Sequence, residues 1–486
     1  MLTSVRTTAQ GHRSALEVHF TLSEVTRAVF ICALSTLLLF WDFYANGFGV
    51  ADHQWFNNHQ RDMESHVVGR MVKSRQDGFF SAGGFLGLGA LNDVPPTWSR
   101  QSFDDQYLAF TDDHTFGGTY RPYKSLTGGQ GLLFGVLDYV IPIASGTKLD
   151  LFHMVASLLS ALTLAAVALW FFQEFGTCVG VFALASILFS QWLVVFGRNL
   201  YWSLWSFYLP MLAVMYLFRN DRSFERRHLI KFSPLVFVCV SVKLLSSGFE
   251  YVTTALVMMM VPISYYFLLD GSDIRKFVKA AFTIVISSSL AVVFAFGILC
   301  LQIASLEGRP RAGVDYVIDA FKRRTYPAPE QFGKERGGRL ESRPHPIRVV
   351  LKFVIGENRG GARGTFFDLN NYLTIPSWTV SEFLFKVRYL YLLILFLLVS
   401  IVILWRSRGF SGACRRKNIA LISTTWVSIA APLSWFYIFN QHSYRHTHMN
   451  FIVWQMPFTI FGFALCGLAV RRIWDARPAQ KVSEIL

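Results

Sequence analysis

Apolar runs of about 18 to 22 residues recur along this chain, and they constrain its fold more than any other feature. Each run is long enough to cross a hydrocarbon core about 30 Å thick as a helix that rises 1.5 Å per residue. Hydrophobic residues make up 53% of the sequence and charged residues only 16%, a balance that is atypical of soluble globular proteins. The sequence therefore predicts an all-α polytopic membrane protein.

Hydropathy predicts about ten transmembrane helices and two long loops that carry interfacial helices. The predicted spans lie near residues 28–46, 150–171, 177–196, 201–218, 229–247, 251–269, 278–302, 387–405, 419–439 and 451–470. The long loops are 47–149, inside a membrane module that covers 28–302, and 303–386. An N-terminal segment (1–27), three spans within 387–470 and a tail (471–486) complete the chain.

The distribution of Lys and Arg predicts how the chain is oriented. If the N-terminus is cytoplasmic, the cytoplasmic segments hold 19 of these residues and the short outer loops hold two, Arg198 and Arg445. This asymmetry follows the positive-inside rule, so we expect both termini in the cytoplasm and both long loops outside. The chain has no Asn-x-Ser/Thr sequon, which favours a bacterial inner membrane. Topology then accounts for the net charge of +15, and we expect no nucleic-acid partner.

The first long loop contains two helical patterns. Residues 60–75 have the periodicity of an amphipathic helix. Met63 and Val67 lie on its apolar side, and Glu64 and Arg70 lie on its edge or opposite face. Residues 132–143 are apolar but too short to span a bilayer comfortably, which fits an interfacial or half-buried helix. We expect both helices to lie on the membrane surface.

The acids of the first helical pattern are candidates for general-base catalysis. A carboxylate that rigid structure holds at the membrane surface can take a proton from an acceptor group, and Glu64 and Asp62 are the two candidates. Arg70, on the same helix, is a candidate for binding substrate. The alternative is an interfacial helix with ordinary solvated charges.

Charged residues in the short outer turns are further candidates for substrate binding. Arg198 lies between two spans, where it should face an acid or an anionic group such as phosphate, or else reach the lipid headgroups. Lys243 and Glu250 share the outer end of two spans, where they either pair with each other or face a ligand.

The last outer turn is rich in histidine. Its spacing fits one helix face poorly, and no outer cysteine or clear carboxylate accompanies it, so we expect no metal cofactor, with a divalent cation as the alternative. A phosphate contact by Arg445 with His442 or His446 is the more economical interpretation, and an interfacial turn is the other.

The placement of the loops resembles that of glycosyltransferases of the GT-C class. The first span leads into a long outer loop with early acids, Asp62 and Glu64, and the seventh span leads into a second long outer loop. Tyr123-Lys124-Ser125 and Gly129-Gln130-Gly131 precede the second span. The chain departs from the family pattern after the first span, where Asp42 stands alone in place of an acid pair.

The resemblance implies an enzyme that moves a sugar from a polyprenyl-phosphate donor to an envelope glycan, lipid or protein acceptor on the outer face of the membrane. Glu64 or Asp62 would be the base, and Arg198, Arg445 or His446 would meet the lipid phosphate. The implied partners are the lipid-linked sugar, the envelope acceptor and membrane lipids. Two alternatives stay open: a transporter or flippase of lipid-linked sugars, and an oligosaccharide polymerase or ligase.

Overall fold

The computed structural model describes residues 22–222, 225–325, 386–410 and 412–475, together with 347, 350–351, 354 and 367–368. Most of this part of the chain is helical and its strands are few, which confirms the predicted all-α class. The strands are short and form two antiparallel pairs: β1 (Gly87–Gly89) with β2 (Tyr120–Pro122), and β3 (Phe367–Asp368) with β4 (Lys386–Val387).

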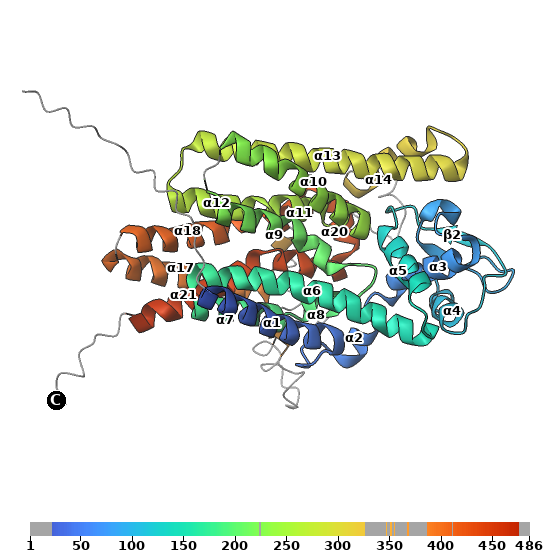
Figure 1. Ribbon diagram of the computed structural model, residues 1–486, viewed down its shortest axis with the longest axis horizontal. Coiled ribbons are helices and arrows are strands. Elements are labelled where there is room, and N and C mark those ends of the chain that lie inside the picture. Colours follow the sequence, from blue (N-terminus) through green and yellow to red (C-terminus); the bar gives the residue numbers. More distant parts are fainter. Residues whose placement is uncertain are drawn as a thin grey trace, which may run out of the picture.

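Apolar helices run side by side between the two ends of an elongated bundle (Figure 1). They are α1 (Leu22–Ala45), α6 (Ser145–Phe175), α7 (Thr177–Leu188), α8 (Gln191–Gly197), α9 (Leu204–Asn220), α10 (Arg226–Ser247), α11 (Val252–Met258), α12 (Met260–Asp270), α13 (Ile274–Glu307), α17 (Tyr389–Arg406), α18 (Gly412–Ser428), α19 (Ala430–Ile438) and α21 (Phe458–Asp475). The short helices η5 (Ser407–Gly409), α20 (Asn440–Arg445) and η6 (Thr447–Gln455) connect some of them. α6 packs against α1, α7 and α9 and forms the centre of one half of the bundle.

The part of the chain that the structure describes contains seven helices that are long and apolar enough to cross a membrane. The number rises to nine if α7 with α8, and η6 with α21, each form one bent span. α9 matches the remaining predicted span, but its 17 residues reach only about 26 Å, which is less than a typical hydrocarbon core. The total of ten spans therefore stays a prediction.

Proline explains several breaks within the predicted spans. Pro262 and Pro432 lie near the starts of α12 and α19, directly after the breaks at Met259 and Ile429. Pro457 separates η6 from α21, which are bent by 43° relative to each other. Because proline has no backbone N–H and its ring clashes with the preceding turn, it disfavours a continuous helix at these three positions.

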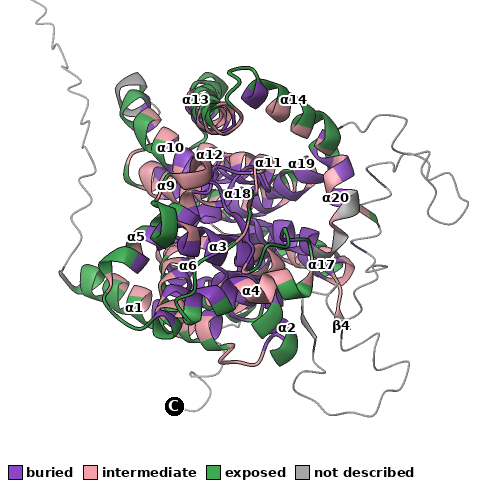
Figure 2. Cartoon of the chain, turned by 90° about the vertical axis from the view of Figure 1, so that its right-hand side faces the viewer, coloured by how far each residue is buried: buried purple, intermediate pink, exposed green. Residues whose placement is uncertain are grey.

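The exposed surface of the bundle is apolar. On α13, Phe282 is 63%, Val293 67% and Leu301 71% exposed. Figure 2 shows the buried residues gathered at the centre of the bundle, with such exposed faces around its rim. A lipid bilayer satisfies these faces, so the bundle is embedded in a membrane.

Most of the first long loop folds into a compact cap at one end of the bundle (Figure 1). It contains α2 (His53–Asn58), α3 (Arg61–Asp77), η1 (Ser81–Gly84), α4 (Arg100–Thr111), α5 (Gly129–Val140) and the β1–β2 pair. We name this end of the bundle the cap end and the opposite end the basal end. The first and last residues of the described helices, Leu22 and Asp475, both lie at the basal end.

α3 confirms the helix predicted for residues 60–75, but its predicted place on the membrane surface is wrong. α4, α5 and β1 pack around it, so that residues 64–72, including Glu64 and Arg70, are buried. β1 approaches so closely that a Cβ atom on Gly69 would overlap the carbonyl oxygen of Gly87. α3 is thus the core of the cap.

Two other amphipathic helices lie at the cap end. α5 confirms the helix predicted near residues 132–143, and it exposes an apolar face that includes Leu133 and Tyr139. α14 (Ala312–Thr325) follows α13 and packs against it and α20. α14 belongs to the second long loop, most of which lies outside the described residues.

Candidate functional site

Glu64, in the first turn of α3, is a carboxylate buried between the cap and the bundle, with 7% of the residue exposed. Its Oε1 accepts a hydrogen bond from the Tyr107 hydroxyl at 3.0 Å and lies 2.9 Å from Nε2 of His153. Its Oε2 accepts a hydrogen bond from the backbone N–H of Leu200 at 3.0 Å. Both oxygens of the carboxylate therefore have fixed partners.

These partners come from elements that are far apart in the sequence. Tyr107 is on α4 of the cap, His153 is near the start of α6, and Leu200 lies in the turn between α8 and α9. The Glu64 carboxylate thus fixes the position of the cap on the bundle.

The electrostatic surroundings keep Glu64 ionised. Burial alone would raise its pKa, but the charge and hydrogen bond of His153, the Leu200 N–H and the charge of Arg198 lower the pKa to about 2. Burial, together with the negative charge of Glu64, raises the pKa of Tyr107 well above its ordinary value, so Tyr107 remains a neutral donor.

A polar cavity of about 210 Å³ borders Glu64. At about 30 Å³ per water molecule, this volume holds roughly seven waters. A single sugar ring occupies a space of similar size. Two cations border it: Arg61 lies over the Tyr107 ring at 4.0 Å, and Arg198 lies over the Phe56 ring at 5.0 Å. The other polar residues of its wall are Asn57, His59, Asp150, His153 and Asn199.

A second buried carboxylate, Glu250, lies in the turn between α10 and α11. Its Oε2 is 3.0 Å from Nε2 of His442, and its Oε1 is 3.4 Å from Nη2 of Arg324. Burial alone would raise the pKa of Glu250, but these two neighbours hold it well below its ordinary value. Glu250 is thus the acid of a second charged cluster, formed by Glu250, Arg324 and His442.

Lys243 contacts the backbone of Glu250 and not its carboxylate, so the two residues do not form the predicted pair of side chains. Lys243 Nζ donates to the backbone carbonyls of Gly248 at 2.7 Å and Glu250 at 2.6 Å. The lysine therefore holds the turn that carries Glu250, while the Glu250 carboxylate faces His442 and Arg324.

The turn between α8 and α9 joins the two carboxylates. The backbone N–H of Leu200 donates to the Glu64 carboxylate. The ring centroid of the next residue, Tyr201, lies 6.5 Å from that of Tyr123. The ring of Trp202 lies 5.8 Å from that of Tyr251, directly after Glu250 in the chain. Aromatic side chains therefore form the wall between the two clusters.

A largely apolar groove of about 210 Å³ extends from the second cluster between α11, α13, α14 and α19. Leu256, Phe296 and Leu299 are among its apolar wall residues. Arg324 borders the groove and also contacts Glu250. A long apolar ligand with one anionic group would match this combination.

Two predicted residues of α3 do not line the Glu64 cavity. Arg70 instead holds the loop after α3: its guanidinium donates to the carbonyls of Gly78, Phe79 and Ser81 and to the side chains of Ser74 and Ser81. The backbone carbonyl of Asp62 accepts hydrogen bonds within α3, and its side chain does not border the cavity.

The predicted histidines of the last outer turn lie close together. The rings of His442 and His446 are 4.4 Å apart, and both charges act on Glu250. The side chain of Arg445 lies outside the described residues. Within the described ranges, no group of three or more His, Cys, Asp or Glu side chains is arranged to hold a metal ion.

Sequence reasoning missed three residues of these clusters. His153 lies within a predicted span, where an ionisable side chain is a signal of function, but the pattern did not connect it with Glu64. Arg324 ends an amphipathic helix in the second loop, and Tyr107 carries no distinctive pattern. Their roles depend on contacts between distant segments.

Comparison with protein-family models and with curated proteins finds no match for this sequence.

Proposed function

We propose that this protein is an integral-membrane glycosyltransferase, similar to the GT-C class, that uses a polyprenyl-phosphate sugar. The observation that carries the proposal is Glu64: one ionised carboxylate, buried where the cap meets the bundle, held by three donors and bordering a polar cavity. General-base chemistry needs such a fixed acceptor.

The proposed reaction is a single displacement. The acceptor hydroxyl oxygen bonds to the anomeric carbon, the bond from that carbon to the phosphate oxygen breaks, and Glu64 takes the hydroxyl proton. A carboxylate of pKa about 2 is a weak base, so the proton moves late, once bond formation has made the acceptor oxygen acidic. Arg61 and Arg198, at the same cavity, would stabilise the charge that develops on the phosphate.

The apolar groove supports a lipid-linked donor. Its wall is made chiefly of aliphatic and aromatic side chains, which suit an isoprenoid chain. Such a donor enters from the bilayer, so a soluble nucleotide site is not required.

The charge asymmetry of the sequence supports an orientation for the reaction. With Lys and Arg concentrated in the segments of the basal end, we propose that the basal end is cytoplasmic and that the cap end faces outward, across a bacterial inner membrane. The acceptor would then be a glycan, lipid or protein of the cell envelope.

The test is sugar transfer by purified protein in liposomes, supplied with a panel of polyprenyl-phosphate sugars and crude envelope acceptor. Glu64→Gln should lower transfer at least 100-fold, because general-base contributions are of this order. Asp93→Asn, which removes an exposed carboxylate of the same cap, is the matched control and should retain full activity.

Each outcome of this test has a separate meaning. Full transfer by Glu64→Gln would remove Glu64 from the mechanism. Absence of transfer by the wild-type protein with every donor would overturn the proposal and favour a transporter of lipid-linked sugars.

A further inference from the structure

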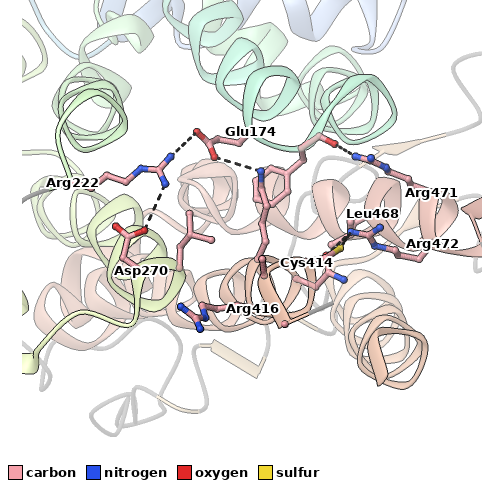
Figure 3. Close-up of a pocket in the computed structure, with 14 residues that line it drawn as sticks. Glu174, Arg222, Asp270, Cys414, Arg416, Leu468, Arg471 and Arg472 are labelled. Atoms are coloured by element: carbon pink, nitrogen blue, oxygen red, sulfur yellow. Dashed lines mark hydrogen bonds and ion pairs between the residues drawn. The ribbon is translucent and has the colours of Figure 1, made fainter. Parts of the chain in front are cut away.

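A second polar cavity lies among the helix ends at the basal end of the bundle, and Figure 3 shows the residues that line it. Its volume is about 660 Å³, within the range of small-molecule sites. The last turns of α6 and α12, the C-terminal part of α21, the first two turns of α18 and the segment after α9 surround it. The proposed transferase chemistry makes no use of this cavity.

Cations outnumber acids around this basal cavity. Its acids are Glu174 and Asp270, and its cations are Arg222, Arg416, Lys417, Arg471 and Arg472. The lining therefore carries a formal charge of +3. Cations held together at the edge of a low-dielectric bundle repel one another, and a bound anion relieves that repulsion.

The two acids do not neutralise these cations through close contacts. Glu174 lies 3.9 Å from Arg222 and 3.8 Å from Lys417, and Asp270 lies 3.6 Å from Arg222. These distances exceed those of a charge-assisted hydrogen bond, about 2.7 to 2.9 Å. In the cap, by contrast, Arg75 and Asp138 meet at 2.6 Å. Arg471 and Arg472 are held elsewhere, because Asp475 lies 3.7 and 3.2 Å from them and Arg471 also donates to the Phe175 carbonyl. Arg222, Arg416 and Lys417 are thus arranged around a space without such close pairs.

Arg416 shows this arrangement most clearly. It forms no hydrogen bond or ion pair with any residue that the structure describes, although its charge acts on Asp270. Figure 3 shows its side chain at the edge of the cavity, on the same helix turn as Cys414. The backbone N–H groups of this first turn of α18 add partial positive charge at the same place.

We propose that the basal cavity binds a phosphate group. Arginine forks and a lysine match phosphate oxygens in charge and geometry. The phosphate belongs either to a lipid headgroup or to a soluble compound. Trp405 and Trp474 are exposed at the same end, which is typical of residues near lipid headgroups, and the Arg222 and Lys417 side chains of the cavity are 41% and 36% exposed.

The experiment measures thermal unfolding of the purified full-length protein in dodecyl maltoside with three probes. Inorganic phosphate tests a soluble source, dioctanoyl phosphatidylglycerol tests a lipid source, and dioctanoylglycerol lacks the phosphate. Arg416→Gln is the test variant, because among the described residues Arg416 forms no hydrogen bond or ion pair that the substitution would break. Arg408→Gln, an exposed cation at the same end that does not line the cavity, is the control.

We expect at least one phosphate-bearing probe to raise the unfolding midpoint saturably, and dioctanoylglycerol to leave it unchanged. Arg416→Gln should weaken the apparent affinity about tenfold, and Arg408→Gln should not. A response to phosphatidylglycerol alone identifies a lipid source, and a response to inorganic phosphate identifies a soluble one.

Two results would overturn the proposal. One is no stabilisation by either phosphate-bearing probe. The other is an equal response of the wild type, Arg416→Gln and Arg408→Gln, which would show that phosphate acts on basic surface in general. Lys417→Gln, at the neighbouring position of the cavity, provides a second variant that should behave as Arg416→Gln does.

Discussion

Glu64 shows how a buried charge is retained in this protein. Removing a carboxylate from water is costly, and only well-placed partners offset that cost. Tyr107, His153 and the Leu200 N–H supply these partners, at 2.9 to 3.0 Å. The sequence identified Glu64 as a candidate from its place on α3, but it did not identify the partners.

His66, two residues further along α3, leads to a prediction about pH. Burial lowers its pKa from 6.5 to about 4, so the unfolded chain binds a proton there at a higher pH than the folded chain does. The free energy of unfolding should therefore fall as the pH drops from about 6.5 to 4, by about 3 kcal/mol over the whole interval. Thermal unfolding followed by tryptophan fluorescence checks this.

His66→Asn is the matching variant for that measurement. An asparagine amide can replace the His66 ring N–H that donates to the Asp62 carbonyl, without the ionisation. The variant should show a flatter profile between pH 6.5 and 4.5, and parallel profiles would contradict the prediction. Glu64, whose pKa is about 2, loses its contribution only below about pH 4.5 and leaves this window unaffected.

At the scale of elements, hydropathy located the helices well and described their surroundings poorly. The predicted spans coincide with observed helices, because an apolar stretch of that length has few other structures available in a bilayer. The pattern of α3 also predicted a helix, yet α4, α5 and β1 bury both its apolar and its charged faces. Periodicity shows which faces are apolar, but not which elements cover the polar ones.

α14 provides a prediction about the proposed donor. Ala320 borders the apolar groove, so Ala320→Trp should fill part of its space of about 210 Å³. If the groove holds the isoprenoid chain, the KM for a long-chain donor should rise at least tenfold, because buried apolar area is lost. The KM for a short-chain, water-soluble donor should stay the same.

Ile318→Trp is the control for this measurement, because Ile318 lies on the same helix, is 48% exposed and does not line the groove. An equal rise in KM for the long and short donors, or equal effects of both variants, would show that the groove does not hold the chain.

At the scale of the whole molecule, the cap lies at one end of the bundle, and the ends of α6, α12 and α18, which line the basal cavity, lie at the other (Figure 1). The bent span of α7 and α8 ends near the cap. The turn that follows it, between α8 and α9, contacts Glu64. The bundle thus separates the two polar sites.

Cysteine labelling in intact cells tests the proposed orientation. A membrane-impermeant maleimide should label Asp93→Cys, in the cap, and should label Arg408→Cys, at the basal end, only after the cells are permeabilised. The wild-type protein, with its six native cysteines, gives the background. The reverse pattern would invert the orientation and place the basal end outside.

The sequence by itself determined that this is a helical membrane protein, where most of its helices lie and which acid to test first. These conclusions depend on composition, apolar length and local periodicity, which act within about 20 residues. Only the tertiary structure decided that His153, Tyr107 and Leu200 hold Glu64, that Arg324 and His442 meet Glu250, and that Arg70 supports a loop. The physical reason is that a buried charge is satisfied by whichever donors packing brings near it, and those donors come from segments up to 192 residues away along the chain.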